Sequence, residues 1–227
     1  MTLKNTANRS AKNTLIKRCA LAMGLSLGLG MVSLPTYAAG DAALYGPTAP
    51  KGSTFIRVYN ASNSEVSATV GNTNLNDVAP LGSTAFSFMP GGDYTAKVGS
   101  QSMPVKLAGD HYYTLVNPAS GKPLLVEEAP FKNKQKSLVR LQNLSDQSLT
   151  LKTADGKTDV VQAVSAKGTG QREINPVKVS LALYSGDKKV ADVKPVALER
   201  GEAAVLYVTG SGSNLSPVWV KPPVETR

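Results

Sequence analysis

Phe55-Ile56-Arg57-Val58-Tyr59-Asn60-Ala61-Ser62 is the stretch that decides the fold, because it occurs a second time as Leu138-Val139-Arg140-Leu141-Gln142-Asn143-Leu144-Ser145. Arginine, asparagine and serine keep their places in both copies, and apolar residues match apolar residues around them. Side chains alternate along a strand, so each copy predicts a β-strand with one apolar face. The Asn-x-Ser end of each copy predicts a turn, because short polar side chains bond back to nearby backbone.

A second pair of matching stretches lies further along the chain. Leu107-Ala108-Gly109-Asp110 precedes the apolar run 112–116, and Leu198-Glu199-Arg200-Gly201-Glu202 precedes the apolar run 203–208. Two copies indicate the duplication of one β-domain, the second longer by a small insertion, rather than a repeat array.

Short alternating stretches between the two motifs are separated by turn signals every 8 to 12 residues, a spacing typical of β-sandwiches. The further strands expected in the first copy are 65–70, 83–88, 93–98, 103–107 and 112–116, and 124–128 is expected to be either the last strand of this domain or a strand that bridges to the next. Those expected in the second copy are 138–142, 148–153, 159–164, 171–174, 177–184, 189–193, 203–208 and 218–220. Hairpin turns are expected at 155–156 and 185–187 and a flexible loop at 211–214. We therefore predict an all-β chain of two tandem immunoglobulin-like antiparallel β-sandwich domains.

The first 38 residues have the pattern of a secretory signal peptide. A basic start without acids precedes the apolar run 19–34, and small residues after it place the expected cleavage behind Ala38. An uncleaved membrane anchor is the alternative, but the run is about 16 residues long and a span needs roughly 20. We expect a periplasmic protein that is not integral to the membrane once the signal is cleaved. The predicted segments are a signal peptide (1–38), an N-terminal arm (39–52), domain one (53–128), a linker (129–136), domain two (137–221) and a tail (222–227).

Net charge and cysteine content limit the classes of function that the sequence supports. The formal net charge is +9, of which the expected signal peptide contributes five, so the rest of the chain carries +4 in scattered positions. Nucleic-acid binding needs a dense basic stripe, so no nucleic-acid partner is expected. A polyanionic carbohydrate remains a candidate partner. The single cysteine, Cys19, falls in the expected signal peptide, which excludes a disulfide framework and cysteine chemistry from the remainder.

The sequence predicts no catalytic residue, metal ligand or cofactor site. His111 is the only histidine, and its neighbour Asp110 is badly placed to orient it, because adjacent strand residues point to opposite faces. No Gly-x-Ser-x-Gly nucleophile motif is present. Glu127 and Glu128 are poor candidates for a glycosidase carboxylate pair, because neighbours on a strand diverge. A catalytic acetyltransferase or esterase would rest entirely on His111.

Six residues are candidates for binding. Leu44 and Tyr45 stand in the Gly- and Pro-rich arm and are candidate anchors for a protein partner, the alternative being an arm that packs on domain one. Four aromatic residues are candidates for stacking on a sugar ring, the alternative being a place in the sandwich core: Tyr94, Tyr112, Tyr113 and Trp219.

The repeated strand and turn resemble the small immunoglobulin-like modules of exported bacterial proteins. The resemblance extends over residues 41–220 to the AlgF family of alginate biosynthesis proteins. It is carried by Asp41-Ala42-Ala43-Leu44-Tyr45-Gly46-Pro47, Phe55-Ile56-Arg57-Val58-Tyr59-Asn60, Pro90-Gly91-Gly92-Asp93-Tyr94 and Val218-Trp219-Val220.

This resemblance implies a periplasmic protein needed for O-acetylation of the polyuronate alginate. It implies a non-catalytic role beside the inner-membrane acyl donor and the periplasmic acetyltransferases, and it offers no catalytic residues to carry over. We expect an adaptor that brings acetyltransferase components together. The alternative is a polyuronate-binding module of the same pathway.

Overall fold

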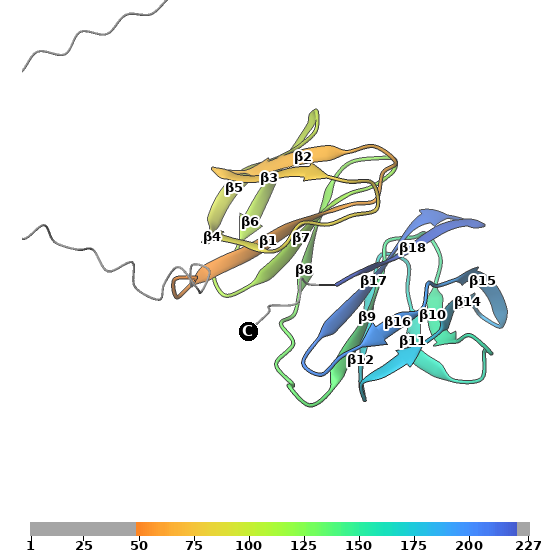
Figure 1. Cartoon of the computed structure of the whole chain (residues 1–227). Coiled ribbons are helices and arrows are strands. Elements are labelled where there is room, and N and C mark those ends of the chain that lie inside the picture. Colours follow the sequence, from red (N-terminus) through yellow and green to blue (C-terminus); the bar gives the residue numbers. More distant parts are fainter. Residues whose placement is uncertain (1–48, 222–227) are drawn as a thin grey trace, which may run out of the picture. The chain divides into compact units, whose positions relative to one another are not determined.

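The computed structural model describes residues 49–221, and these residues form eighteen β-strands (Figure 1). Residues 49–221 contain no helix, and therefore no helix that is long and apolar enough to cross a membrane. The prediction of an all-β chain with tandem β-domains is confirmed. The exact domain boundaries stay predictions.

The first eight strands form two four-stranded sheets. Sheet A has the order β4-β1-β7-β8, with β4 (Ser87–Pro90), β1 (Ser53–Asn60), β7 (Tyr112–Asn117) and β8 (Leu124–Glu128). Sheet B has the order β3-β2-β5-β6, with β3 (Thr73–Val78), β2 (Val66–Val70), β5 (Gly92–Val98) and β6 (Gln101–Leu107). Ile56, Val58 and Leu115 of sheet A pack with Val70 and Ala96 of sheet B in one buried core. The side chains between them on β1 and β7 therefore point away from that core.

The later ten strands repeat this architecture. Sheet C has the order β12-β9-β17-β18, with β12 (Thr169–Ile174), β9 (Ser137–Asn143), β17 (Ala203–Ser211) and β18 (Asn214–Val220). Sheet D has the order β11-β10-β14-β15, with β11 (Asp159–Val164), β10 (Leu149–Thr153), β14 (Leu181–Ser185) and β15 (Lys188–Asp192). The two remaining strands, β13 (Val177–Val179) and β16 (Val196–Leu198), pair only with each other. They are the additional strands of the longer second copy.

The repeated asparagine closes the same turn in both domains. The amide nitrogen of Asn60 donates hydrogen bonds to the main-chain oxygens of Ser64 (2.7 Å), Val78 (2.9 Å) and Ala79 (3.3 Å). The amide of Asn143 makes the corresponding bonds to Gln147 (2.8 Å), Val164 (3.0 Å) and Ser165 (3.0 Å). In each copy the serine two positions later donates its hydroxyl to the asparagine oxygen. Both asparagines are fully buried. In each domain the motif therefore holds the end of the first strand against the loop that leads to the second sheet, sheet B or sheet D.

Each domain holds one parallel pair of strands within its otherwise antiparallel sheets. β1 runs parallel to β7, with Arg57 opposite Thr114, and β9 runs parallel to β17, with Arg140 opposite Val205. The first strand of each domain therefore lies between a strand from the middle of the domain, β4 or β12, and a later strand, β7 or β17. Local alternation in the sequence does not reveal this order.

Several predicted strand limits were wrong for identifiable reasons. β3 was missed because it is rich in Asn and Asp, and because a bulge opposite Val66 and Ala68 breaks its alternation. The run 177–184 divides at Ser180, since β13 pairs with β16 while β14 pairs with β10 and β15. The strand expected at 83–88 begins at Ser87, with only an isolated bridge from Ser83 to Tyr59 before it.

The segment 211–214, expected to be a flexible loop, is a tight hairpin turn. Ser211 pairs directly with Asn214, and β17 and β18 stay in register down to Val205 and Val220. Gly210 has a φ of 94°, and a Cβ there would lie 2.0 Å from the main-chain oxygen of Asn214. Only glycine fits at this position.

Candidate functional site

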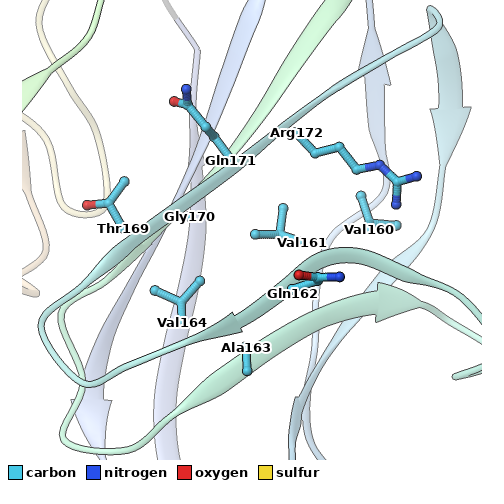
Figure 2. Close-up of a pocket in the computed structure, with 9 residues that line it drawn as sticks. All are labelled: Val160, Val161, Gln162, Ala163, Val164, Thr169, Gly170, Gln171 and Arg172. Carbon is cyan, nitrogen blue, oxygen red and sulfur yellow. The ribbon is translucent and has the colours of Figure 1, made fainter.

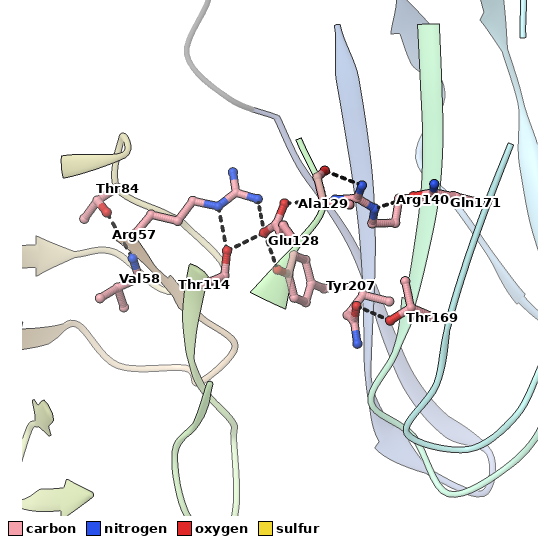
Figure 3. Close-up of polar contacts among 11 residues, drawn as sticks. Arg57, Val58, Thr84, Thr114, Glu128, Ala129, Arg140, Thr169, Gln171 and Tyr207 are labelled. Atoms are coloured by element: carbon pink, nitrogen blue, oxygen red, sulfur yellow. Dashed lines mark hydrogen bonds and ion pairs between the residues drawn. The ribbon is translucent and has the colours of Figure 1, made fainter. Parts of the chain in front are cut away.

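The strongest polar cluster of the described residues joins the two domains at Glu128, the last residue of β8 (Figure 3). Its Oε1 accepts hydrogen bonds from Nη2 of Arg57 (2.7 Å), from the hydroxyl of Tyr207 (2.8 Å) and from the hydroxyl of Thr114. Its Oε2 lies 3.5 Å from Nη1 of Arg140 in domain two. We call these five residues the junction cluster. One carboxylate thus serves two guanidinium groups from the two copies of the repeated strand.

Further bonds fix both arginines in place. Arg57 donates through Nε to the hydroxyl of Thr114 (2.9 Å). Arg140 donates through Nε to Gln171 (3.0 Å) and through Nη2 to the main-chain oxygen of Ala129 (2.7 Å). Arg57, Glu128 and Arg140 are all buried. Buried charges are tolerated when they are paired and hydrogen-bonded, as they are here.

Burial and charge act in opposite directions on the pKa of Glu128. Burial raises the pKa, but the positive charge of Arg57 and hydrogen bonds from Thr114, Arg57 and Tyr207 outweigh it. The pKa of this carboxyl is therefore lower than its ordinary value. Burial, and then the charge of Glu128, raise the pKa of the Tyr207 hydroxyl, while burial raises the pKa of Tyr59 to about 12. Glu128 is thus ionised and the two tyrosines are neutral at physiological pH.

A third apolar cluster accompanies these charges. Tyr59 and Val116 from the outer surface of sheet A pack with Val205 and Tyr207 of sheet C. The rings of Tyr59 and Tyr207 lie 4.8 Å apart between centroids and are tilted by 36°. The two domains therefore share buried apolar contacts as well as the junction cluster.

His111 is an exposed residue directly before β7. Its Nδ1 lies 2.7 Å from Oε1 of Glu127, and the two side chains are 46% and 56% exposed. Glu127 and Glu128 point to opposite faces, as predicted from strand alternation. Within residues 49–221 no serine, threonine or cysteine side chain is hydrogen-bonded to the imidazole ring of His111, since the hydroxyl of Thr54 donates to its main-chain oxygen instead (3.3 Å). In the same range no three His, Cys, Asp or Glu side chains gather where they could hold a metal ion.

The four candidate sugar-stacking residues lie in four separate settings. The hydroxyl of Tyr94 donates to the main-chain oxygen of Pro90 (2.8 Å), and its ring covers Gly71. Tyr113 is 5% exposed and packs in the core of domain one. Trp219 packs against the core of domain two and donates to the main-chain oxygen of Lys194 (2.9 Å). Tyr112 alone stands on the outer surface of sheet A, stacked on Phe55.

The other two candidates, Leu44 and Tyr45, lie outside the described residues, so their role stays a prediction.

A hollow of about 400 Å³ opens between β11 and β12 (Figure 2). Its floor is formed by valines, and its rim carries Gln162, Thr169, Gln171 and Arg172. The guanidinium of Arg172 donates to the main-chain oxygen of Asp159 (2.7 Å). The lining contains no acid, histidine or cysteine.

The junction cluster was not predicted from the sequence, although a signal for it was present. An arginine stands in the middle of an apolar strand in both copies, at Arg57 and Arg140. Such a residue is expected to be paired, because an isolated buried charge is costly. Local sequence does not identify Glu128 as that partner, because it lies 71 residues from Arg57.

The comparison with known proteins assigns the family. The family described as "Alginate O-acetyl transferase AlgF" matches residues 26–205. The chain belongs to the AlgF family.

Curated relatives are consistent with this assignment. The alginate biosynthesis protein AlgF of Pseudomonas syringae pv. tomato is 81% identical over 227 residues, which is all of both chains. The AlgF protein of Pseudomonas fluorescens is 76% identical over 93% of this chain and 97% of its own. The solved C-terminal domain of AlgF from P. aeruginosa is 69% identical and covers 39% of this chain and 99% of its own, with a TM-score of 0.36.

Proposed function

We propose that this AlgF-family protein is a non-catalytic periplasmic adaptor for O-acetylation of the exopolysaccharide alginate. It brings periplasmic acetyltransferases together, beside the inner-membrane acyl donor. Membership of the AlgF family, whose description names alginate O-acetylation, supports the pathway. The signal-peptide pattern of residues 1–38 supports the periplasm.

The proposal that the protein is not catalytic rests on the exposed surroundings of His111. It is the only histidine of the chain, and it pairs with Glu127 on an open surface. Acyl transfer needs a base that contacts its nucleophile, and a site from which water is excluded. An exposed histidine bonded to an exposed carboxylate meets neither condition.

Co-purification with the periplasmic acetyltransferases tests the adaptor role. The exported chain, residues 39–227, is expected to retain at least one of them, and deletion of Asp41–Pro47 is expected to weaken retention if Leu44 and Tyr45 anchor the partner. Replacing His111 by alanine serves as the matched variant, because it leaves the arm unchanged. It should retain the partner and support full acetylation of alginate in cells. Low acetylation with intact folding would restore a catalytic role.

A polyuronate-binding module is the second candidate, favoured by the +4 charge of the chain after the expected cleavage and by the partly exposed ring of Tyr112. Binding of this kind weakens as salt rises, because exposed charges are screened within about 8 to 10 Å near physiological ionic strength. Titration of the exported chain with polyuronate oligomers at low salt separates the two candidates. No binding at low salt removes this one.

A further inference from the structure

One surface of domain one carries a concentration of aromatic rings that its core does not use. Phe55 of β1 lies opposite Phe88 of β4 and opposite Tyr112 of β7 in the strand register. The rings of Phe55 and Tyr112 stack at 4.5 Å with an interplanar angle of 9°, and Phe86 meets Tyr112 edge-on at 5.3 Å. We call these four residues the aromatic face. Three of the four phenylalanines of the chain belong to it.

The aromatic face lies on the outer surface of sheet A. The neighbouring residues Ile56, Met89 and Tyr113 point into the core, so the rings between them point outward. Phe88 is 36% exposed, and the other three rings are partly exposed. Adjacent exposed rings of this kind mark binding surfaces more often than isolated exposed side chains do.

The second domain is an internal control for what the fold itself requires. In the equivalent register of β9, β12 and β17, Leu138 lies opposite Glu173 and opposite Ala203. In domain two Gln171 bonds to Arg140, whereas at the equivalent position of domain one Phe86 packs on Arg57. The same architecture is thus built with no aromatic residue at these positions. The β-sandwich architecture itself therefore does not require rings at these positions.

Another part of the outer surface of sheet A is already covered by domain two, and it shows which residues pack there. Further along sheet A, Tyr59 and Val116 are buried by Tyr207 and Val205 of domain two. The residues that cover them, Val205 and Tyr207, are uncharged. The aromatic face continues this interface, because Phe86 packs on the guanidinium of Arg57 at 4.6 Å and Arg57 belongs to the junction cluster.

Charge favours a protein over a polyuronate on the aromatic face. The cation that lies on it, Arg57, is 1% exposed and is bonded to Glu128 and Thr114. Its guanidinium group is therefore buried and is unavailable to the carboxylates of a polymer. Stacked aromatic rings without a free cation suit apolar side chains, as in the centres of protein interfaces.

We propose that the aromatic face is the docking surface for an uncharged, apolar patch of a periplasmic alginate acetyltransferase. This inference rests on the proposed adaptor function and names the surface that performs it. Phe88 is the ring that protrudes most, so it is the anchor that enters the partner.

The test measures the affinity of residues 39–227 for each purified periplasmic alginate acetyltransferase of the same organism. Phe88→Ser is expected to weaken binding at least about tenfold, as loss of an aromatic anchor does. The matched control is Val177→Ser, because Val177 is an apolar side chain of domain two that is 46% exposed and lies outside the aromatic face. Its affinity should change by less than about twofold, since most interface-distant truncations are neutral. Chemical shifts of the wild-type chain provide a second readout, and the signals of residues 55, 86, 88 and 112 should move on binding.

Any of four other outcomes would overturn the inference. Normal binding by Phe88→Ser, with chemical-shift changes elsewhere, rejects the aromatic face and leaves the adaptor role standing. Failure of the wild-type chain to bind any of the acetyltransferases rejects both. Movement of the aromatic signals on addition of polyuronate oligomers assigns the face to the polymer. Self-association of the chain that is lost in Phe88→Ser assigns it to a second copy.

Discussion

At the scale of single residues, Glu127 and Glu128 show how one step along a strand changes the role of a carboxylate. Glu127 is 56% exposed and pairs with His111, whereas Glu128 is 7% exposed and holds two arginines and two hydroxyl groups. Chemically identical side chains therefore provide a matched pair for mutation.

We expect Glu128→Gln to lower the free energy of unfolding by about 3 to 5 kcal/mol, because it leaves two buried guanidinium groups without their counter-charge. Glu127→Gln should change it by less than about 0.5 kcal/mol, as exposed substitutions do. Urea unfolding of the two variants and the wild type measures both values. Equal effects of the two substitutions would show that the junction cluster does not contribute to stability.

The lowered pKa of Glu128 predicts a pH dependence of stability in acid. A carboxyl with a lower pKa in the folded state contributes stability that is fully present above its unfolded pKa, about 4.3. That contribution is lost as the pH falls through the folded pKa. The difference in unfolding free energy between wild type and Glu128→Gln should therefore be constant above about pH 5 and shrink below pH 4. A difference that stays constant in acid would contradict the cause given for the pKa.

At the scale of elements, the repeated strand and turn depend on the buried asparagine. Asn60→Asp replaces an amide that donates to three main-chain oxygens by a carboxylate that repels them. We expect a loss of roughly 3 kcal/mol, because buried acceptors are left unpaired and a charge is buried beside them. Asn63→Asp, at an exposed position in the same turn, is the control and should be nearly neutral. Thermal unfolding of the two variants gives the comparison, and similar losses in both would refute the role of Asn60.

The elements also show what the sequence reveals and what it conceals. The apolar alternation around Ile56 and Val139 and the Asn-x-Ser turns are local signals, so the all-β class and the duplication were predictable. The strand β3 was concealed because its Asn- and Asp-rich residues are held by pairing with β2 rather than by their own propensity. The junction cluster was concealed because Arg57, Glu128 and Arg140 come together only through the tertiary fold.

At the scale of the whole molecule, the two copies have diverged on the outer surfaces of sheets A and C. The cores, sheet orders and buried asparagines correspond, whereas the outer surface of sheet A carries rings and that of sheet C carries Glu173 and Gln171 at the matching positions. Duplication preserved the fold and left the outer surfaces free to differ. An adaptor needs such unlike surfaces, because each contacts a different neighbour.

The most direct test of the adaptor role is the affinity of residues 39–227 for the purified periplasmic alginate acetyltransferases, measured with and without a saturating polyuronate. A specific contact of standard size buries about 1,600 Å² and excludes solvent from its centre, so free polymer should not displace it. We predict that at least one acetyltransferase binds with an affinity that the polymer leaves unchanged. Binding abolished by the polymer, or polymer bound in the absence of any acetyltransferase contact, would contradict the adaptor role and identify a carbohydrate-binding protein.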